Sequence, residues 1–379
     1  MKKVLAMLFA VVLVIGVFAG CQSPAQDTPA APDKSAAQQP TQEQPAPEKE
    51  IKIGMIPKFT GVDYFIACEN GARKAAADLG VTLDWQGDPS GQETAANQMA
   101  YIQTFIDKGY DAILVSALDA ESYADVLKSA MDMGIIVITW DADVRADSRH
   151  YFVNQTENSD IGVAMMQGMA NSFSEPGKVA LVSSDPNASN QNAWMAAIQA
   201  EYESKKDSDY AHVSFHSEII YAGNNQADAD RAVNTLMTQN PDIKGIFALS
   251  SMATPATSKA CEDLGLPVGA VAIAALGVPI TSIDAMESGL MPAVVLWQPY
   301  DLGYLAVELA VDILKGDASL DMASYTSSLS GKSQIGDTMY PAAHKITEDG
   351  QVILGPSIAY NLDNVYKFKG YPDPTSGLQ

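Results

Sequence analysis

The chain has 379 residues, 47% of them hydrophobic, and a formal net charge of −23. This composition supports sizeable hydrophobic cores and excludes a wholly disordered chain, and the length suffices for two domains of ordinary size. The strong negative charge argues against nucleic acid as a partner. The four histidines do not cluster in the sequence, so we expect no metal site and no cofactor.

The first residues are typical of a bacterial lipoprotein signal peptide. Two lysines precede an apolar run over residues 4–19, which is short for a transmembrane helix because a span needs roughly 20 apolar residues. The small residues before Cys21 resemble a lipobox, the site at which a lipoprotein-processing peptidase cleaves. We predict that residues 1–20 are removed and that lipid on Cys21 tethers the chain to the outer face of a membrane. An ordinary secretory signal and an uncleaved anchor are the alternatives.

Residues 21–49 are predicted to form a flexible linker. After Cys21 this stretch contains six Pro, six Ala and six Gln and no Val, Ile, Leu or aromatic residue, so it cannot build a core. The linker would hold the folded part of the chain away from the membrane.

From Ile51 onward, short apolar runs alternate with segments of helical periodicity. In a first series, strands are expected at 51–56, 81–85, 112–116, 135–140 and 150–154, with helices at 64–79, 92–107 and 121–133. In a second series, strands are expected at 178–183, 213–221, 245–249, 271–275 and 292–297, with helices at 161–172, 190–202, 227–239, 253–264, 283–288 and 302–315. Two such series predict an α/β fold of two doubly wound parallel-sheet lobes.

Two cysteines remain besides Cys21. Cys68 and Cys261 each fall in a predicted helix among apolar neighbours. We therefore expect buried thiols, with one disulfide as the alternative.

Polar groups and an indole recur directly after the predicted strands. Ligands of open parallel sheets bind beyond the carboxyl ends of the strands, so these residues are candidates for one site. A carboxylate accepts two hydroxyl hydrogens, an amide both donates and accepts, and an aromatic face covers the C–H side of a sugar ring. The pattern predicts a small polyhydroxylated ligand. For any single residue, a solvated loop position, a helix cap or a core position is the alternative. The residues are Lys58, Asp141, Asn190, Gln191, Ser250, Ser251, Trp297 and Gln298.

Several segments resemble the periplasmic sugar-binding proteins of the ribose-binding type. Within that superfamily they are most similar to the lipoproteins of the Lsr importer that bind autoinducer-2, a quorum-sensing signal, and to their rhamnose-binding relatives. The resemblance runs from about Ile51 to the end of the chain. The segments are IGMIPKFTGVDYF, GYDAILVSALD, ITWDADV, SNQNAW, VLWQPYDLGY and SIAYNLDNVYKFKGY.

The resemblance implies a two-lobe type I fold that closes over its ligand, with crossings near Gln155, Gly277 and Pro299. The first lobe would comprise residues 50–154 and 278–298, and the second lobe residues 155–277 and 299–379. It also implies the permease of an ABC importer as the partner.

The resemblance also implies a set of ligand-binding residues and three departures from the family pattern. Asn190 stands where the autoinducer-2 receptors usually have aspartate, and Gln298 stands where an aspartate is frequent. Residues 249–251, Leu-Ser-Ser, replace a Pro-Asp-Ala segment. Each polar replacement loses a charge-assisted hydrogen bond but keeps a polar side chain. The predicted binding residues are Lys58, Tyr64, Asp141, Asn190, Gln191, Leu249, Ser251 and Trp297.

Together these features predict a monomeric, lipid-anchored substrate-binding protein that captures autoinducer-2 or a closely related compound. Rhamnose or another monosaccharide is the alternative ligand. A third hypothesis is an exported sugar-acting enzyme, which would need a nucleophile with a base or two suitably spaced carboxylates. Asp143 is next but one to Asp141 along the chain, Asp119 is expected to start a helix, and no carboxylate is expected at the other strand ends. We therefore predict no catalytic residue.

Overall fold

The computed structural model describes residues 50–89, 92–291, 293–335 and 337–369. The predicted signal peptide, Cys21 and the rest of the linker lie outside these residues. Across the described ranges, no helix has both the length and the apolar character that crossing a membrane requires.

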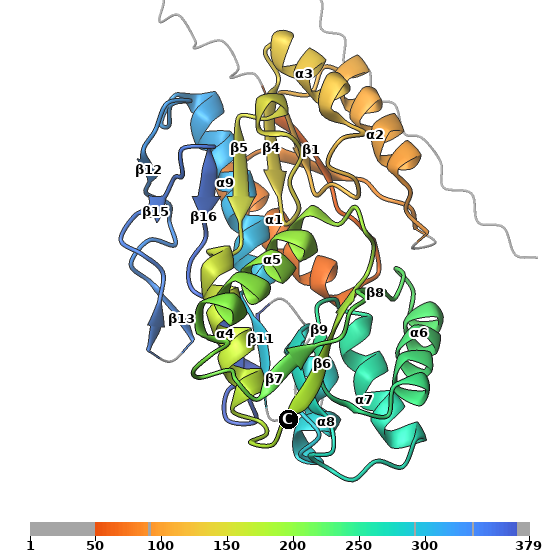
Figure 1. Ribbon diagram of the computed structural model, residues 1–379. Helices are drawn as coiled ribbons and strands as arrows, with labels where there is room; N and C mark the ends of the chain where they lie inside the picture. The colour runs from red at the N-terminus through yellow and green to blue at the C-terminus, as the bar shows by residue number, and fades with distance from the viewer. Residues whose placement is uncertain (1–49, 90–91, 292, 336, 370–379) are drawn as a thin grey trace, which may run out of the picture. The chain divides into compact units, whose positions relative to one another are not determined.

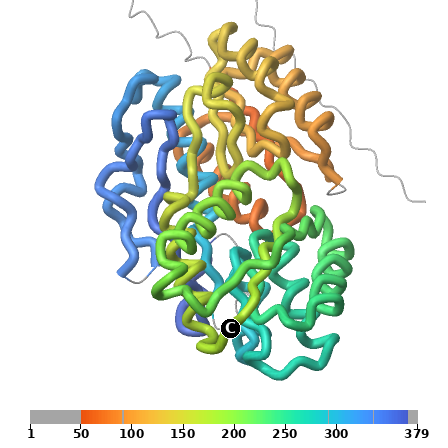
Figure 2. Tube along the Cα trace, in the orientation of Figure 1, coloured from red at the N-terminus to blue at the C-terminus, as the bar shows by residue number. Residues whose placement is uncertain are grey.

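The first sheet has six parallel strands in the order β16-β5-β4-β3-β1-β2. Five of them match the first predicted series, and the sixth, β16, comes from the end of the chain and lies beside β5 (Figure 2). The strands are β1 (Lys52–Ile56), β2 (Thr82–Trp85), β3 (Ala112–Val115), β4 (Ile136–Trp140), β5 (Tyr151–Asn154) and β16 (Gln351–Ile353).

Helices cover both faces of the first sheet. Successive residues of a strand point to opposite faces, so they pack in two different cores. Ile113 and Val137 pack in one core with α2 (Ala95–Asp107) and α3 (Ala124–Asp132). Leu114 and Ile138 pack on the other face with α1 (Asp63–Leu79) and α9 (Pro299–Lys315) (Figure 1).

The second sheet has seven strands. Six follow the order β17-β11-β10-β9-β6-β7, and β8 pairs with the last residues of β6, further along that strand than β7. Its pairs are parallel except that β17 runs antiparallel to β11. The predicted strand over 213–221 is in fact two short strands. The strands are β6 (Gly177–Ser183), β7 (Val213–Phe215), β8 (Ile220–Tyr221), β9 (Ile243–Ala248), β10 (Ala272–Leu276), β11 (Val294–Leu296) and β17 (Ile358–Tyr360).

The second sheet is also covered on both faces. Leu181 and Phe247 belong to the core that includes α4 (Asn158–Ala170) and α5 (Ser189–Lys205). Val182 and Ile246 belong to the core with α6 (Gln226–Gln239), α7 (Ala253–Asp263) and α8 (Ile283–Glu287). The α/β fold of two doubly wound sheets is therefore as predicted.

Short elements complete the described part, and the sequence patterns did not predict them. Two small antiparallel pairs lie between α9 and β16, and three short 3₁₀ helices follow β4, β10 and β17. They are β12 (Ser324–Tyr325) with β15 (His344–Lys345), β13 (Ser333–Ile335) with β14 (Thr338–Met339), η1 (Ala146–Ser148), η2 (Pro279–Ser282) and η3 (Val365–Lys367).

The late segments belong to other sheets than expected. Residues 278–298 were expected in the first lobe, but β11 pairs with β10 in the second sheet. Residues 299–379 were expected in the second lobe, but α9 packs on α1 and β16 pairs with β5 in the first sheet. The chain therefore crosses between the sheets after β5, after β11 and after β16, and not near Gly277.

Two glycines explain why α9 docks on α1. A Cβ atom on Gly71 of α1 would lie 1.8 Å from the carbonyl oxygen of Tyr300, and one on Gly303 of α9 would lie 2.0 Å from that of Cys68. Such close approach of two helix backbones is possible only where a side chain is missing on each. The contact joins residues far apart in the chain, so periodicity alone does not reveal it.

The two described cysteines are buried free thiols, as predicted. Cys68 lies in α1 and Cys261 in α7, in two different cores. Burial raises the pKa of the Cys261 thiol to about 11, which keeps it protonated and unreactive at neutral pH.

Candidate functional site

A cavity of about 290 Å³ lies where the carboxyl ends of strands from both sheets meet. Its size is at the lower end of the range for small-molecule pockets. Residues that line it follow directly after β1, β4, β6, β9, β10 and β11, and others come from the first turns of α1 and α5.

The structure brings all eight predicted binding residues to the wall of this one cavity. Four come from the segments that follow β1, β4, β9 and β11, and the others from nearby turns and helices. They are Lys58, Tyr64, Asp141, Asn190, Gln191, Leu249, Ser251 and Trp297. Their role in binding a ligand remains a prediction.

Asp141 follows β4 and is held in an unusual backbone conformation. Its φ of 62° makes it the one residue other than glycine with a positive φ in the described ranges. Its carboxylate accepts hydrogen bonds from Ser116 Oγ at 2.7 Å and from Gln155 Nε2 at 3.1 Å. Gln155 also donates to the backbone oxygen of Asp141 at 2.7 Å. The carboxylate is only 3% exposed, and these hydrogen bonds from the protein hold it in place.

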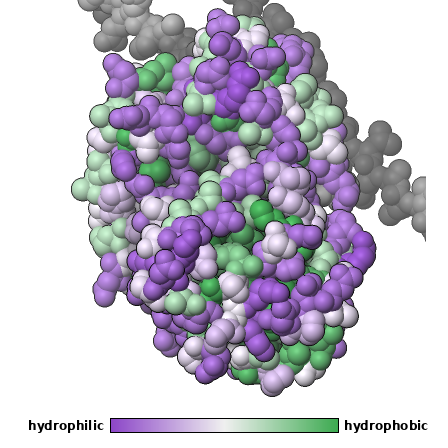
Figure 3. All heavy atoms as spheres, viewed as in Figure 1, coloured by the Kyte–Doolittle hydropathy of each residue, from purple (hydrophilic) through white to green (hydrophobic). Residues whose placement is uncertain are grey.

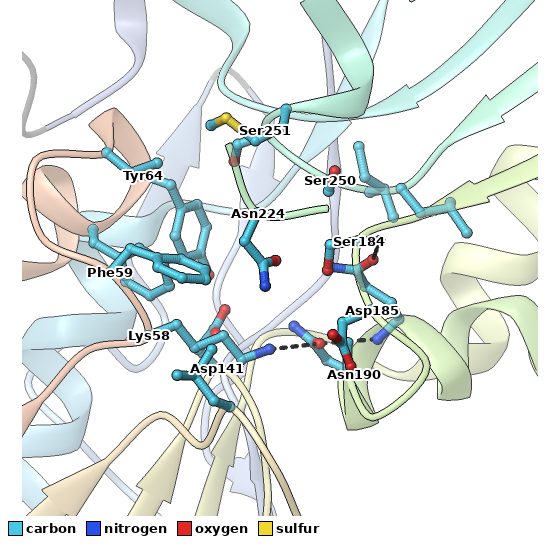
Figure 4. A pocket seen from close by; sticks show the side chains of 18 of the residues that line it. Lys58, Phe59, Tyr64, Asp141, Ser184, Asp185, Asn190, Asn224, Ser250 and Ser251 are labelled. Carbon is cyan, nitrogen blue, oxygen red and sulfur yellow. Dashed lines mark hydrogen bonds between the residues drawn. The ribbon is translucent and has the colours of Figure 1, made fainter. Parts of the chain in front are cut away.

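Lys58 reaches from the first sheet to the second. Its Nζ donates to Asn190 Oδ1 at 3.0 Å, as the dashed line in Figure 4 shows. Burial lowers the pKa of Lys58 from its ordinary value, while the carboxylates of Asp141 and Asp185 act in the opposite direction. An ammonium carries three hydrogens, more than the bond to Asn190 uses, so it can donate to a ligand oxygen.

Aromatic rings line one side of the cavity. Trp297 donates from Nε1 to the hydroxyl of Tyr64 at 2.9 Å, and its ring also contacts Trp194, with centroids 5.6 Å apart. Burial raises the pKa of Tyr64 well above its ordinary range, and the nearby Asp141 carboxylate raises it further. Tyr64 therefore remains a hydroxyl donor. Trp297 is only 1% exposed, so it bounds the cavity more than it presents a free ring face.

The second sheet contributes neutral polar groups that are already bonded to one another. Gln191 Oε1 accepts from Ser183 Oγ and Ser184 N, each at 2.7 Å, and its Nε2 donates to Ser184 Oγ at 2.8 Å. One amide hydrogen of Gln191 remains for a ligand. Leu249 is fully buried and shapes the cavity without offering a polar side chain.

The expectation that no carboxylate follows the other strands was wrong. Asp185 comes two residues after β6 and lines the cavity beside Asn190 (Figure 4). Asp119 lines it too, although its Oδ1 accepts from the backbone of Glu121 and Ser122, as expected of a residue that starts a helical turn. Glu93 is a third carboxylate on the wall.

Other cavity residues were missed for identifiable reasons. Ser184 and Asp185 satisfy the same strand-end rule that selected the predicted residues, so the sequence held their signal. Asn224 follows β8, which was not separated from β7 in the sequence pattern. Phe59 has no signal beyond its position next to Lys58.

Gln298 does not line this cavity. Its side chain is fully buried and faces the last described residues. It donates to Lys367 O at 3.4 Å and accepts from Lys369 N at 3.1 Å. The replacement of aspartate at this position therefore does not alter the polar groups that face the cavity.

No cluster of three or more His, Cys, Asp and Glu side chains in the described ranges has the arrangement of a metal site. The side chains that line the cavity offer donors and acceptors suited to hydroxyl and carbonyl groups.

Two mainly parallel sheets, joined by three crossings of the chain and enclosing a cavity at their strand ends, define the fold of the type I periplasmic binding proteins. The model of the periplasmic binding protein domain matches residues 53–318, and the chain belongs to that family.

Curated relatives include binding proteins for several sugars. The ribose import binding protein of Bacillus subtilis is 23% identical over 277 residues, which is 71% of this chain and 83% of that protein. The xylose/arabinose-binding protein of Sulfolobus acidocaldarius is 22% identical over 268 residues; this match spans 67% of this chain and 64% of that protein.

Solved structures share the fold over nearly their whole length. An ABC transporter solute-binding protein from Clostridium phytofermentas, solved with bound L-rhamnose, is 26% identical with a TM-score of 0.75; the match covers 84% of this chain and 98% of that one. LsrB from Clostridium saccharobutylicum, solved with AI-2, is 23% identical with a TM-score of 0.69; the match covers 83% and 98%.

Proposed function

We propose that this protein is the substrate-binding subunit of an ABC importer and captures autoinducer-2 or a closely related, small, sugar-like compound between its two sheets. The observation that carries the proposal is the opposition of two polar walls across one cavity. Lys58 and Asp141 come from the first sheet, and Asn190 and Gln191 come from the second. A ligand that bonds both walls at once would favour their approach.

The chemistry of the walls selects an uncharged polyol. The cavity is lined by one lysine and by four carboxylates, Glu93, Asp119, Asp141 and Asp185. This excess of negative charge would repel sugar acids and sugar phosphates, while hydroxyl groups can donate to the carboxylates and accept from Lys58. Autoinducer-2 and simple sugars both meet this requirement.

A second candidate ligand is L-rhamnose or another monosaccharide. The solved structure with bound L-rhamnose supports it, as does the replacement of aspartate by Asn190. An amide there keeps one acceptor for Lys58 and adds two donor hydrogens, which suits a different pattern of ligand hydroxyls.

A sugar-acting enzyme is the weaker hypothesis, although the cavity holds more than one carboxylate. Asp141 accepts from Ser116 and Gln155, which hold its carboxylate as a fixed acceptor for ligand hydroxyls. The matched relatives are binding proteins of transporters. We therefore propose capture without catalysis.

The location that fits this role is the outer face of the cell membrane, or the periplasm of a cell with two membranes. Lipid on Cys21 would keep the binding protein, as a monomer, near the permease that receives the ligand. Replacing Cys21 with serine is expected to release the protein from membranes into the soluble fraction; persistent membrane attachment would contradict the lipid anchor.

The experiment that tests the function has two arms. Native mass spectrometry of the freshly purified chain identifies any ligand that it carries from the cell. Thermal-shift screening with autoinducer-2, L-rhamnose, D-ribose and matched sugar acids and phosphates then ranks affinities. We expect a single-site shift with at least one neutral compound and none with the anionic ones, both for the full chain and for residues 50–379. No shift with any neutral compound and no carried ligand would refute the proposal.

A further inference from the structure

One of the three crossings between the sheets is bonded directly to Asp141. Gln155, the first residue after β5, donates to the Asp141 backbone oxygen at 2.7 Å and to Oδ1 at 3.1 Å. A second crossing leads to the same part of the cavity, because Trp297, the first residue after β11, donates at 2.9 Å to the hydroxyl of Tyr64. Tyr64 and Asp141 both line the cavity.

The backbone of Asp141 needs this support. The left-handed conformation is unfavourable for a residue with a Cβ, so contacts with its surroundings help Asp141 to hold its φ of 62°. Gln155 supplies two of the fixing contacts, one to the backbone and one to the side chain.

In the described part of the chain, the side chain of Gln155 makes hydrogen bonds to Asp141 alone. It is 1% exposed, and its Oε1 is buried with no hydrogen-bond partner in the described part of the chain. Burying an amide oxygen without a partner is unfavourable, so the orientation of this side chain is set by the two bonds that Nε2 makes.

We propose that Gln155 is a positioning residue that couples the first crossing between the sheets to the orientation of the ligand-binding carboxylate of Asp141. This inference rests on the proposed function. When the crossing changes its backbone angles, the bonds from Gln155 would turn or release Asp141. By linkage, a ligand held by Asp141 then stabilises the crossing geometry in which those bonds are formed.

Ser116 provides a matched contrast. Its hydroxyl donates to the other carboxylate oxygen of Asp141 at 2.7 Å, but Ser116 follows β3, and its backbone bonds Ile56 and Gln98 within the first lobe. Ser116→Ala therefore removes one bond to Asp141 without cutting its tie to the crossing. Gln155→Met removes the tie while keeping a side chain of similar length.

The test measures the separation of the sheets and the affinity in the same molecules. Spin labels on Lys128→Cys in α3 and Lys259→Cys in α7, both exposed, report the distance between the two sheets by pulsed electron resonance. The background is the full chain with Cys21→Ser; Cys68 and Cys261 are buried and escape labelling. The probes are autoinducer-2, L-rhamnose and D-ribose.

We expect Gln155→Met to broaden the label-distance distribution without any probe and to weaken probe binding by at least tenfold. Ser116→Ala should weaken binding while both its free and its saturated distributions stay as in the parent. If Gln155→Met leaves the free distribution unchanged, or if Ser116→Ala broadens it equally, the coupling role is overturned. Failure of every probe to bind the parent would sink the proposed function, whereas the probe-free distributions still decide the role of Gln155.

Discussion

The two walls of the cavity differ in how their polar groups are held. The wall from the first sheet carries buried charge: Lys58 and Asp141 are 6% and 3% exposed. The wall from the second sheet carries amides and hydroxyls bonded to one another around Gln191, with the partly exposed Asp185 at its side. The first wall is thus suited to supply binding strength, because hydrogen bonds to charged groups are the stronger ones, and the second to select among hydroxyl patterns.

The largest expected effect comes from comparing one carboxylate of each wall. Asp141→Ala should weaken binding of the neutral probe by roughly 100-fold, since a bond to a buried charge contributes up to about 3 kcal/mol. Asp185→Ala should weaken it only about tenfold, because water screens a partly exposed group. Isothermal titration measures both affinities, and circular dichroism checks folding. Equal losses would remove the distinction between the walls, and full affinity in Asp141→Ala would exclude Asp141 from the site.

Lys58→Met separates binding from stability on the first wall. Burial disfavours the ammonium, as its lowered pKa indicates, so the apolar replacement should stabilise the ligand-free protein by about 1 kcal/mol, or about 2–4 °C. The sign follows from linkage: below pH 10.5 the unfolded state holds this proton more readily, so the burial cost is largest at low and neutral pH.

The same variant should lose the thermal shift caused by the probe. Lys52→Met, on the exposed start of β1, is the control and should change neither property. A Lys58→Met protein that is less stable and still binds would reverse the assignment of Lys58.

On the second wall, Asn190→Asp should change selectivity more than strength. A carboxylate at 190 would pair directly with Lys58, whose Nζ now lies 3.0 Å from the amide oxygen, and would lose the two donor hydrogens of the amide. We expect the ratio of autoinducer-2 affinity to L-rhamnose affinity to rise about tenfold. Asn192→Asp adds the same charge to an exposed position of α5 and should leave the ratio unchanged. An unchanged ratio in Asn190→Asp would mean that position 190 does not select the ligand.

The smallest expected effect is a pH dependence of stability that arises at His344, which is not among the residues that line the cavity. Burial lowers the pKa of His344, whose ring bonds Ser327 Oγ at 2.7 Å and the carbonyl oxygen of Ile353 at 3.0 Å. As the pH falls below 6.5, this histidine therefore takes up a proton more readily in the unfolded state than in the folded state. The unfolding temperature of the ligand-free protein should fall by a few degrees between pH 7 and pH 5.

His344→Gln should flatten that slope, and the partly exposed His216→Gln should not. Thermal unfolding at the two pH values measures both. If His344→Gln keeps the full slope, the acid sensitivity belongs to other groups.

The sequence predicted the sheets and most of one site because both follow from local rules. Strands alternate with helices of matching length, and the residue after each strand is placed at the cavity by topology alone. Lys58, Asp141, Leu249 and Trp297 obey that rule, and Asp185 could have been found by it. The sequence could not show which sheet the last segments join, because that depends on the contact of Gly71 with Tyr300 and on the pairing of β16 with β5.

The support behind the site was also beyond sequence reasoning. Gln155 was expected at a crossing, but nothing in the sequence shows that Asp141 adopts a positive φ and needs its amide. The hydrophilic side chains that cover most of the face seen in Figure 3 follow directly from the composition, whereas the few that turn inward do not.

The glycine contact between α1 and α9 has a mechanical consequence. Backbone pressed on backbone cannot adjust by side-chain rotation, so these two helices should travel as one rigid body. Tyr64 lies in the first turn of α1, and α9 begins just after Gln298, at the crossing that follows β11. At this crossing, any change of backbone angles between the lobes therefore falls on the few residues between β11 and α9, of which Trp297 lines the cavity.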